Sequence, residues 1–241
     1  MKLSVIVPAF NEEKLIAACL ESIHAALSAN ARPDFETEVI VVDNNSTDRT
    51  AAIARDDGAR VVFEPVNQIS RARNAGARVA SGDWFLFVDA DSFPSAELVG
   101  DVLELIDKNR VVGCGSKVCM RPMPLYGHVL VGLWHTVSIL FRWAAGSFVV
   151  CRAEAFRELD GFSENMYAAE EIDFSIRLRR WGKRRGLKFT ILRRHPLKTS
   201  NRKIHLYGLK GFAQIFYHAI VHPRKALRDP ESLPMWYDGK R

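Results

Sequence analysis

The sequence predicts an α/β fold in which a mainly parallel sheet is flanked by helices. Short apolar runs alternate with helical patterns through the first half of the chain, as they do in βαβ units. These runs are almost continuous in Val, Ile, Leu and Phe, which is typical of strands covered on both faces. The segments between the runs are long enough for right-handed crossovers, so consecutive strands are expected to be parallel.

The first half of the chain holds the clearest of these elements. Ser46 or Thr47 is a natural N-cap for the second helix, and Gly58 and Gly82 end the second and third helices. In chain order, the expected elements are a strand at 3–8, a helix at 12–29, a strand at 38–43, a turn and helix at 44–58, a strand at 59–65, a helix at 70–83 and a strand at 84–89.

The regular alternation of strand and helix patterns ends after about residue 115. We therefore divide one compact domain into a half at 1–115 and a smaller half at 116–241. The second half is rich in aromatic residues and less regular in its pattern. Its expected elements are a helix within 120–146, a strand at 147–152, a helix ending at Gly182 and an amphipathic helix at 205–221.

The bulk composition fits a globular protein. The chain has 241 residues, of which 48% are hydrophobic, and a net charge of +6. No apolar run reaches the ~18 residues of a membrane span, and the N-terminus lacks the pattern of a signal peptide, so we expect a cytoplasmic protein. The cysteines are scattered without a metal-binding spacing, so we expect them to be reduced thiols.

A strongly basic segment runs from Arg177 to Arg194 without an acidic residue. Such a segment could face anionic lipid, nucleic acid or a phosphorylated substrate, or it could be a solvated surface. No nucleic-acid-binding module accompanies the segment, so a nucleic-acid partner is not expected.

Two carboxylates stand at the carboxyl end of the strand expected at 84–89. Asp89 and Asp91 stand on either side of Ala90, at the edge where open α/β sheets bind ligands. The first and second strands also end in acidic segments, which contain Glu12 and Asp43. Gathered carboxylates repel one another unless a cation lies between them, and oxygen ligands suit Mg²⁺ or Mn²⁺. This edge therefore predicts a divalent metal that holds substrate phosphates.

Five motifs occur in order along the chain: SVIVPAFNEE, VVDNNSTDRT, ARNAGA, FVDADS and EEIDFSIRL. Their order and spacing resemble those of family 2 glycosyltransferases with the GT-A fold, over residues 3–182. The resemblance implies a Rossmann-like sheet, with a nucleotide-sugar-binding half at 1–115 and an acceptor-side half at 116–241. It also implies an inverting transferase that moves a sugar from a nucleotide-sugar donor, most often UDP-linked, to a hydroxyl acceptor.

The resemblance implies a role for each matching residue at the donor site. Asp43 would accept a hydrogen bond from the base or ribose, Asp89 would contact the ribose or a metal-bound water, and Asp91 would ligate the metal. His195 would be a further metal ligand or a plain surface residue. The expected donor-binding residues are Pro8, Ala9, Glu12, Asp43, Arg73, Asn74, Asp89, Ala90, Asp91 and Arg202, and the expected ligands of Mn²⁺ or Mg²⁺ are Asp91, Asp89 and His195.

An inverting displacement also needs a base near the acceptor. The resemblance places this base at EEIDF, where Glu171 stands in place of the usual Asp. Glu170 could share the task, and Asp173 or Glu170 could instead orient Arg177. An acidic first turn that complements the helix dipole is the alternative interpretation of this stretch.

The acceptor side is less defined by the sequence. Gly146 and Ser147 resemble the small-residue segment that lines the acceptor site, although a turn explains them equally well. The chain lacks a Q-x-x-R-W box and flanking membrane spans, which predicts non-processive transfer to a lipid-linked acceptor, a glycan or a small molecule. Aromatic residues within 134–143 and 205–221 could pack in the core, form a homodimer interface or contact the inner face of the cell membrane peripherally.

Other functions stay open at this point. A catalytically silent nucleotide-sugar-binding protein would keep the donor site without turnover, and the departure at Glu171 allows it. A haloacid-dehalogenase-like phosphatase also ends a strand with D-x-D, but that motif normally ends the first strand. A dinucleotide oxidoreductase is not expected, because no G-x-G-x-x-G follows a strand.

Overall fold

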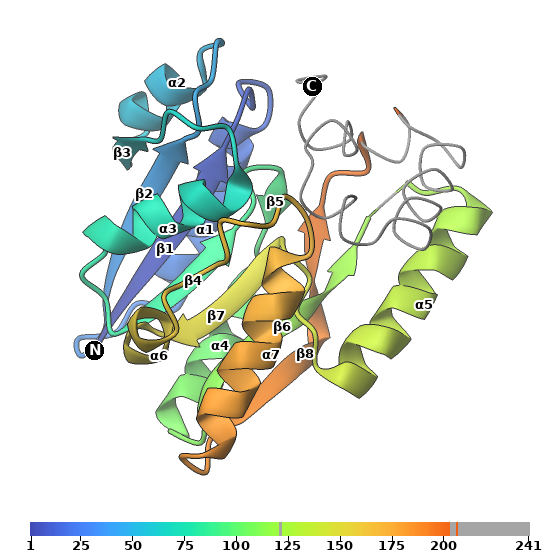
Figure 1. Ribbon diagram of the computed structural model, residues 1–241. Coiled ribbons are helices and arrows are strands. Elements are labelled where there is room, and N and C mark those ends of the chain that lie inside the picture. Colours follow the sequence, from blue (N-terminus) through green and yellow to red (C-terminus); the bar gives the residue numbers. More distant parts are fainter. Residues whose placement is uncertain (121, 203–205, 207–241) are drawn as a thin grey trace.

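The computed structural model describes residues 1–120, 122–202 and 206, with an eight-stranded sheet at its centre (Figure 1). Strand and helix alternate from β1 to β4, as the sequence predicts. The strands are β1 (Lys2–Ala9), β2 (Glu36–Asp43), β3 (Arg60–Phe63), β4 (Trp84–Val88), β5 (Ser92–Phe93), β6 (Val111–Cys119), β7 (Phe148–Arg152) and β8 (Lys188–Thr199). The helices are α1 (Ile16–Ala29), α2 (Thr50–Asp56), α3 (Ile69–Val79), α4 (Ala96–Asp107), α5 (Leu125–Phe141), α6 (Ala153–Glu158) and α7 (Glu170–Lys183).

Parallel pairing dominates the sheet, whose strand order is β3-β2-β1-β4-β7-β6-β8-β5. β1 pairs in parallel with β2 and β4, β2 with β3, and β6 with β8. β7 is antiparallel to both of its neighbours, β4 and β6, and β5 is antiparallel to β8. The prediction of an α/β fold with a mainly parallel sheet is confirmed, and β7 joins the two parallel parts of that sheet.

Helices cover both faces of the sheet. Val5 and Leu86 belong to a buried cluster that includes residues of α1 and α4. Their neighbours Ile6 and Phe87 belong to a second cluster with residues of α3, α6 and α7. Because successive side chains of a strand point to opposite faces, continuous apolar runs are what this three-layer arrangement requires. Each fully buried side chain of this kind contributes about 1.5–3 kcal/mol.

The second half of the chain departs from the sequence-based expectations. β8 was not predicted, because charged side chains interrupt its apolar pattern. Residue 115 lies within β6, so one strand crosses the expected division of the domain. The helix that the sequence predicts over 164–182 corresponds to α7, which begins only at Glu170, after an irregular segment. Apart from Leu206, the amphipathic helix expected at 205–221 lies outside the described residues.

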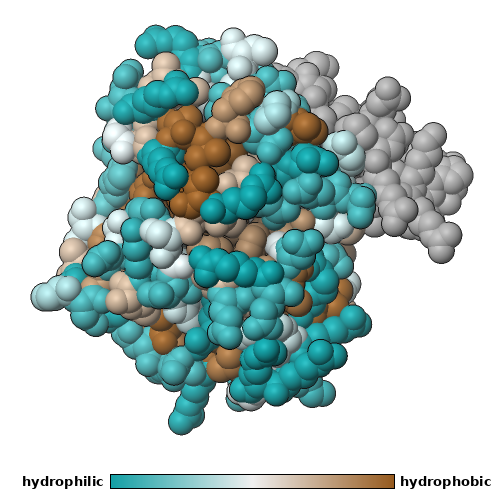
Figure 2. Space-filling view, turned by 60° about the vertical axis from the view of Figure 1, so that its left-hand side comes forward, coloured by the Kyte–Doolittle hydropathy of each residue, from teal (hydrophilic) through white to brown (hydrophobic). Residues whose placement is uncertain are grey.

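The surface differs between the two sides of the molecule. The side that carries β2, β3 and α3 is mostly hydrophilic, and its largest hydrophobic patch lies in the upper middle of the view in Figure 2. α5, at the other end of the sheet, contains no charged residue and exposes several large apolar side chains. None of the helices within the described ranges is long and apolar enough to cross a membrane.

Candidate functional site

The carboxyl ends of β1, β2 and β4 meet at one edge of the sheet. Pro8 and Ala9 end β1 level with the end of β2, where Ala9 pairs with Asp43. Asp89 and Ala90 directly follow β4. All of these residues except Asp89 are buried. The structure therefore brings the polar ends of three strands to the edge where open α/β sheets bind their ligands.

The loops that follow β1 and β2 are fastened to each other. The backbone N–H of Asn11 donates to Ser46 Oγ over 3.0 Å, and Asn11 Oδ1 accepts from the backbone N–H of Thr47 over 2.8 Å. The backbone N–H of Glu12 donates to Thr50 Oγ1 over 2.7 Å. Ser46 and Thr47 thus join the two loops and do not cap α2, which begins at Thr50. This bracing fixes the backbone that presents Glu12.

Both loops contain an asparagine in the left-handed backbone region. Asn11 has a φ of 53° and Asn45 a φ of 67°, a conformation that Asn tolerates better than most residues. Asp43 is buried, and its Oδ1 accepts a hydrogen bond from the backbone N–H of Ser46 over 3.0 Å. The left-handed backbone therefore explains why asparagine stands at position 11 of the NEE segment and at position 45 of the DNNST segment.

Arg73, on α3, joins three other parts of the chain. Its Nη1 donates to Glu170 Oε1 over 2.7 Å, and its Nη2 donates to Asp89 Oδ1 over 3.0 Å and to the Gly146 carbonyl over 2.8 Å. Only 1% of Arg73 is exposed. Burial alone would lower the pKa of Arg73, but the charges of Asp89 and Glu170 raise it. The guanidinium therefore remains charged and holds the end of β4 to the start of α7.

The start of α7 presents two adjacent glutamates in different surroundings. Ala169 enters the helix with a φ of 60°, which is uncommon for a residue with a side chain. Glu170 is buried against Arg73, whereas Glu171 is partly exposed. Burial, and then the charge of Glu170, raises the pKa of Glu171 to about 8. Burial also raises the pKa of Glu170, against the opposing charge of Arg73.

The segment before β7 passes close to these groups. A Cβ at Gly146 would lie 3.3 Å from Arg73 Nη2 and 3.3 Å from Glu171 Cδ, so a side chain there would crowd both groups. The carbonyl of Ser147 accepts from the backbone N–H of Asp89 over 3.3 Å. Gly146 and Ser147 therefore lie between the end of β4 and the start of α7.

A second arginine binds the carboxylates on the other side of the site. Arg202, which lies shortly after β8, donates from Nη1 to Glu12 Oε2 over 3.0 Å and from Nη2 to Glu12 Oε1 over 2.7 Å. Its Nη2 is also 4.0 Å from Asp91 Oδ2. Although burial would lower the pKa of Arg202, its bond to Glu12 raises it. Arg202 thus supplies positive charge between two acids at the sheet edge.

Asp91 is the carboxylate best placed to receive a further cation. The hydroxyl of Ser92 donates to its Oδ1 over a long 3.5 Å, and Arg202 stays 4.0 Å away. Within the described residues, no group of three or more His, Cys, Asp or Glu side chains could hold a metal ion. Mg²⁺ is often bound by one or two carboxylates together with substrate phosphates. Asp91 fits that kind of site, whereas Asp89 already pairs with Arg73.

Asn74 contacts the loop before α7 instead of the strand ends. Its Oδ1 accepts from the backbone N–H of Phe162 and its Nδ2 donates to the Phe162 carbonyl, each over 2.9 Å. Gln68, a buried residue with no recognisable signal in the sequence, donates to the carbonyls of Glu164 and Met166. These two side-chain amides hold the loop that leads into α7, so they affect the site indirectly, through the position of that helix.

Two other expected site residues have partners elsewhere. His195 Nδ1 lies 3.0 Å from Asp101 Oδ2 on α4, so the structure pairs this imidazole with Asp101 and not with Asp91. Asp173 accepts a 2.7 Å hydrogen bond from Arg177 Nε. Of the alternatives considered for Asp173, the structure matches the one in which it orients Arg177.

The chain matches a known family and several curated proteins. The family model described as Glycosyl transferase family 2 matches residues 4–153. An uncharacterized glycosyltransferase of Haemophilus influenzae is 29% identical over 186 residues, which is 73% of this chain and 61% of that protein. The poly(ribitol-phosphate) β-N-acetylglucosaminyltransferase TarS of Staphylococcus aureus is 35% identical over 116 residues, or 45% of this chain and 19% of that protein. The chain thus spans less than two-thirds of the length of these relatives.

Solved structures share the fold at lower sequence identity. S. aureus TarS 1–349 in complex with UDP-GlcNAc superposes with a TM-score of 0.63 at 21% identity, over 99% of this chain and 79% of that one. The mannosyltransferase PcManGT from Pyrobaculum calidifontis, in complex with GDP-Man and Mn²⁺, gives a TM-score of 0.62 at 19% identity, over 98% and 73% of the two chains. These likenesses confirm the GT-A fold. Because the family model covers more than half of the sequence, the chain belongs to glycosyl transferase family 2.

Proposed function

We propose that the protein is an inverting glycosyltransferase that moves a sugar from a UDP-linked donor to a hydroxyl acceptor. The observation that carries the proposal is the buried Arg73, which holds Asp89 at the end of β4 and Glu170 at the start of α7. This link brings a carboxylate for the donor and the neighbouring Glu171 for the acceptor to one site. Family membership and the UDP-GlcNAc complex of TarS support the choice of donor.

The nucleotide would lie across the ends of β1 and β2. Pro8 and Ala9 offer their backbone there, and Asp43 would accept a hydrogen bond from the base or ribose. The two braced loops leave these groups little freedom to move. Such preorganisation favours binding, because less conformational entropy is lost when the ligand arrives.

The diphosphate would lie between Asp91 and Arg202. Arg202 would exchange its hydrogen bonds to Glu12 for bonds to phosphate oxygens, a geometry that suits a guanidinium. Asp91 would hold Mn²⁺ or Mg²⁺ together with those phosphates. A divalent ion bound there would stabilise the negative charge that develops on the departing nucleoside diphosphate.

Glu171 would act as the base. The acceptor oxygen attacks the anomeric carbon as the bond from that carbon to the diphosphate oxygen breaks, and Glu171 takes the hydroxyl proton. Two observations favour Glu171 over Glu170: Glu171 is the more exposed, and its pKa is raised to about 8, near the pH at which a general base works best. Glu170 would neutralise Arg73. Because the attack comes from the side opposite the leaving group, the anomeric configuration inverts.

The acceptor would approach past Gly146, where the missing side chain keeps Arg73 and Glu171 uncrowded. The sequence lacks the Q-x-x-R-W box, which supports one transfer per encounter. The chemistry of this site suits any hydroxyl acceptor, whether lipid-linked, part of a glycan or a small molecule.

Calorimetry with UDP-sugars and Mn²⁺, joined to an assay of UDP release, tests the proposal. Asp91→Asn should remove the metal-dependent part of donor binding. Glu171→Gln should keep donor affinity but slow UDP release by about 10²–10⁴-fold, the usual contribution of a positioned base. Asp101→Asn, a carboxylate on α4 away from the strand ends, is the control and should change neither quantity.

Two results would contradict the proposal. Unchanged metal-dependent affinity in Asp91→Asn would remove Asp91 from the metal site. Tight donor binding by the wild type without UDP release, even by slow hydrolysis or across a panel of hydroxyl acceptors, would favour a catalytically silent binding protein.

A further inference from the structure

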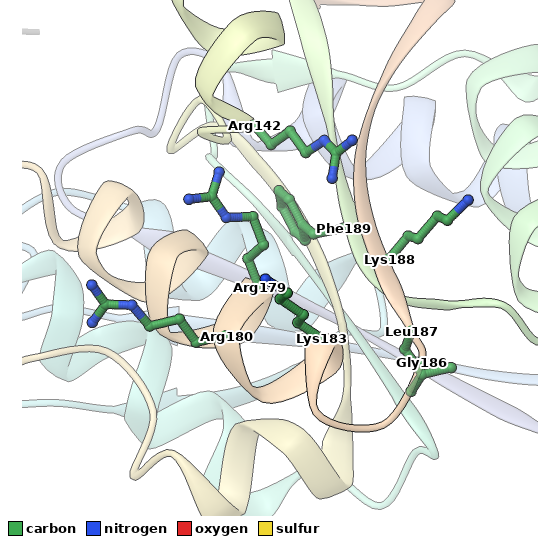
Figure 3. Close-up of a pocket in the computed structure, with 8 residues that line it drawn as sticks. All are labelled: Arg142, Arg179, Arg180, Lys183, Gly186, Leu187, Lys188 and Phe189. Carbon is green, nitrogen blue, oxygen red and sulfur yellow. The ribbon is translucent and has the colours of Figure 1, made fainter.

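A basic pocket lies between the end of α7, the start of β8 and the end of α5 (Figure 3). Its volume is about 580 Å³. Phe189 lies between the side chains of Arg142 and Arg179, and Gly186 and Leu187 form the adjacent turn. The cationic side chains that line the pocket are Arg142, Arg179, Arg180, Lys183 and Lys188.

Within the described residues, no carboxylate pairs with the positive charges of this pocket. Other basic residues of the same helix and turn are paired: Arg177 with Asp173, and Arg185 with Glu158. By contrast, none of the cationic residues that line the pocket forms an ion pair with a carboxylate of the described chain. Arg179 donates from Nη1 to a backbone carbonyl, that of Phe141. Uncompensated cations around a concave surface attract an anionic ligand.

The neighbouring helix α5 has an apolar outer face. Its exposed large side chains include Leu125 (82%), Val129, Leu133 and Leu140 (72%), which recur at helical spacing along one side. The helix contains no Asp, Glu, Lys or Arg. A continuous exposed apolar stripe of this kind marks a surface for another molecule or for a membrane.

The basic pocket and the apolar stripe are continuous. Phe141, the last residue of α5, is exposed and accepts a 2.6 Å hydrogen bond from Arg179 Nη1 of the pocket. Arg142 follows at once in the left-handed conformation, with a φ of 55°, and its side chain turns into the pocket. Exposed apolar side chains next to these cations match the surface of an anionic bilayer, in which charged headgroups lie next to acyl chains.

We propose that this region binds the surface of an anionic lipid bilayer, with a lipid phosphate in the basic pocket and the α5 stripe against the acyl chains. A protein partner would need carboxylates for the pocket and apolar groups for the helix in one contact, whereas an anionic lipid supplies both in each molecule. This inference does not depend on the proposed transferase activity, because it uses none of the residues at the strand ends.

Vesicle sedimentation with the full chain tests the proposal. The protein should bind vesicles that contain phosphatidylglycerol and should bind those of phosphatidylcholine alone much more weakly. Arg179→Gln/Arg180→Gln should lower the partition coefficient by about fivefold for each charge lost. Leu133→Glu should also lower the coefficient, since it places a charge within the apolar stripe.

The matched control is Arg55→Gln/Arg78→Gln, which removes the same charge from α2 and α3. It should bind anionic vesicles almost as the wild type does. Circular dichroism of each variant would show that lost binding does not come from lost folding.

Several results would overturn the proposal. One is equal binding to neutral and anionic vesicles; another is an equal loss in the control variant. Calorimetric binding of glycerol phosphate without vesicle binding would assign the pocket to a soluble phosphate compound. A dimer in sedimentation velocity that Leu133→Glu converts to monomer, again without vesicle binding, would assign the α5 face to a second copy of the chain.

Discussion

Two arginines meet carboxylates at the edge of the sheet, and they do so in different ways. In the inner cluster, Arg73 binds Asp89 and Glu170 from the interior of α3. In the outer cluster, Arg202 binds Glu12 beyond the end of β8 and stays 4.0 Å from Asp91. Arg73 is 1% exposed and has partners just after β4, on α7 and at the Gly146 carbonyl, whereas the Arg202 side chain is 16% exposed.

The difference in burial decides whether each charge pair can exchange its partners. A buried ion pair cannot lose one member without leaving an uncompensated charge in a low-dielectric interior. The inner cluster therefore keeps its partners and holds the start of α7 in a constant position. A less buried pair exchanges partners at lower cost, because water and incoming ligands replace the lost contacts. The outer cluster can therefore open for a phosphate group.

The largest expected effect is on stability, from the inner cluster. Arg73→Met should lower the free energy of unfolding by about 3–5 kcal/mol, because Glu170 and Asp89 lose their cation. Urea denaturation measures this loss. Arg71→Met, on the same helix but with a half-exposed ion pair to Glu164, should cost no more than about 1 kcal/mol. An equal loss of unfolding free energy in Arg73→Met and Arg71→Met would show that burial of the inner cluster does not make its ion pairs more important for stability.

A smaller effect is expected from Glu170→Gln, which keeps a hydrogen-bond acceptor for Arg73. Loss of the charge should cost about 1–3 kcal/mol. It should also lower the pKa of Glu171, since the charge of Glu170 is the second cause of its rise after burial. A base works only when deprotonated, so in the wild type kcat/KM should rise with pH until about 8. The acid limb of the variant's profile should lie at lower pH.

The pH profile of UDP release checks that expectation. Glu158→Gln, which removes a charge at the far end of α6, should leave the acid limb where it is. An acid limb that does not move in Glu170→Gln would mean that another group limits the rate.

The smallest stability change is expected in the outer cluster. Arg202→Ala should lower the free energy of unfolding by only about 1 kcal/mol, because the Arg202 side chain is 16% exposed, whereas that of Arg73 is 1% exposed. Without the competing guanidinium, these acids should attract divalent cations more strongly. Mn²⁺ alone should therefore raise the Tm of Arg202→Ala more than that of the wild type in differential scanning fluorimetry. An equal Tm rise in both proteins would show that Arg202 does not occupy the place of a cation.

The strands of the first half, and the acids that follow them, could be predicted from the sequence. Apolar runs such as 84–88 fix which segments are buried, and the next residues must then lie at the sheet edge. Asp89, Asp91 and the glutamates at the start of α7 were found this way or by their resemblance to family motifs. β8 could not be predicted, because its alternation of buried and charged positions lacks a continuous apolar run.

The sequence by itself therefore determined the alternation of strand and helix, the family, and the carboxylates available for the chemistry. The tertiary structure alone decided which cation each carboxylate meets. Glu12 and Arg202 are 190 residues apart, and Arg73 and Glu170 are 97 apart, so no local pattern couples them. It also decided the raised pKa of Glu171, since burial and a neighbouring charge are properties of the folded surroundings and not of the side chain.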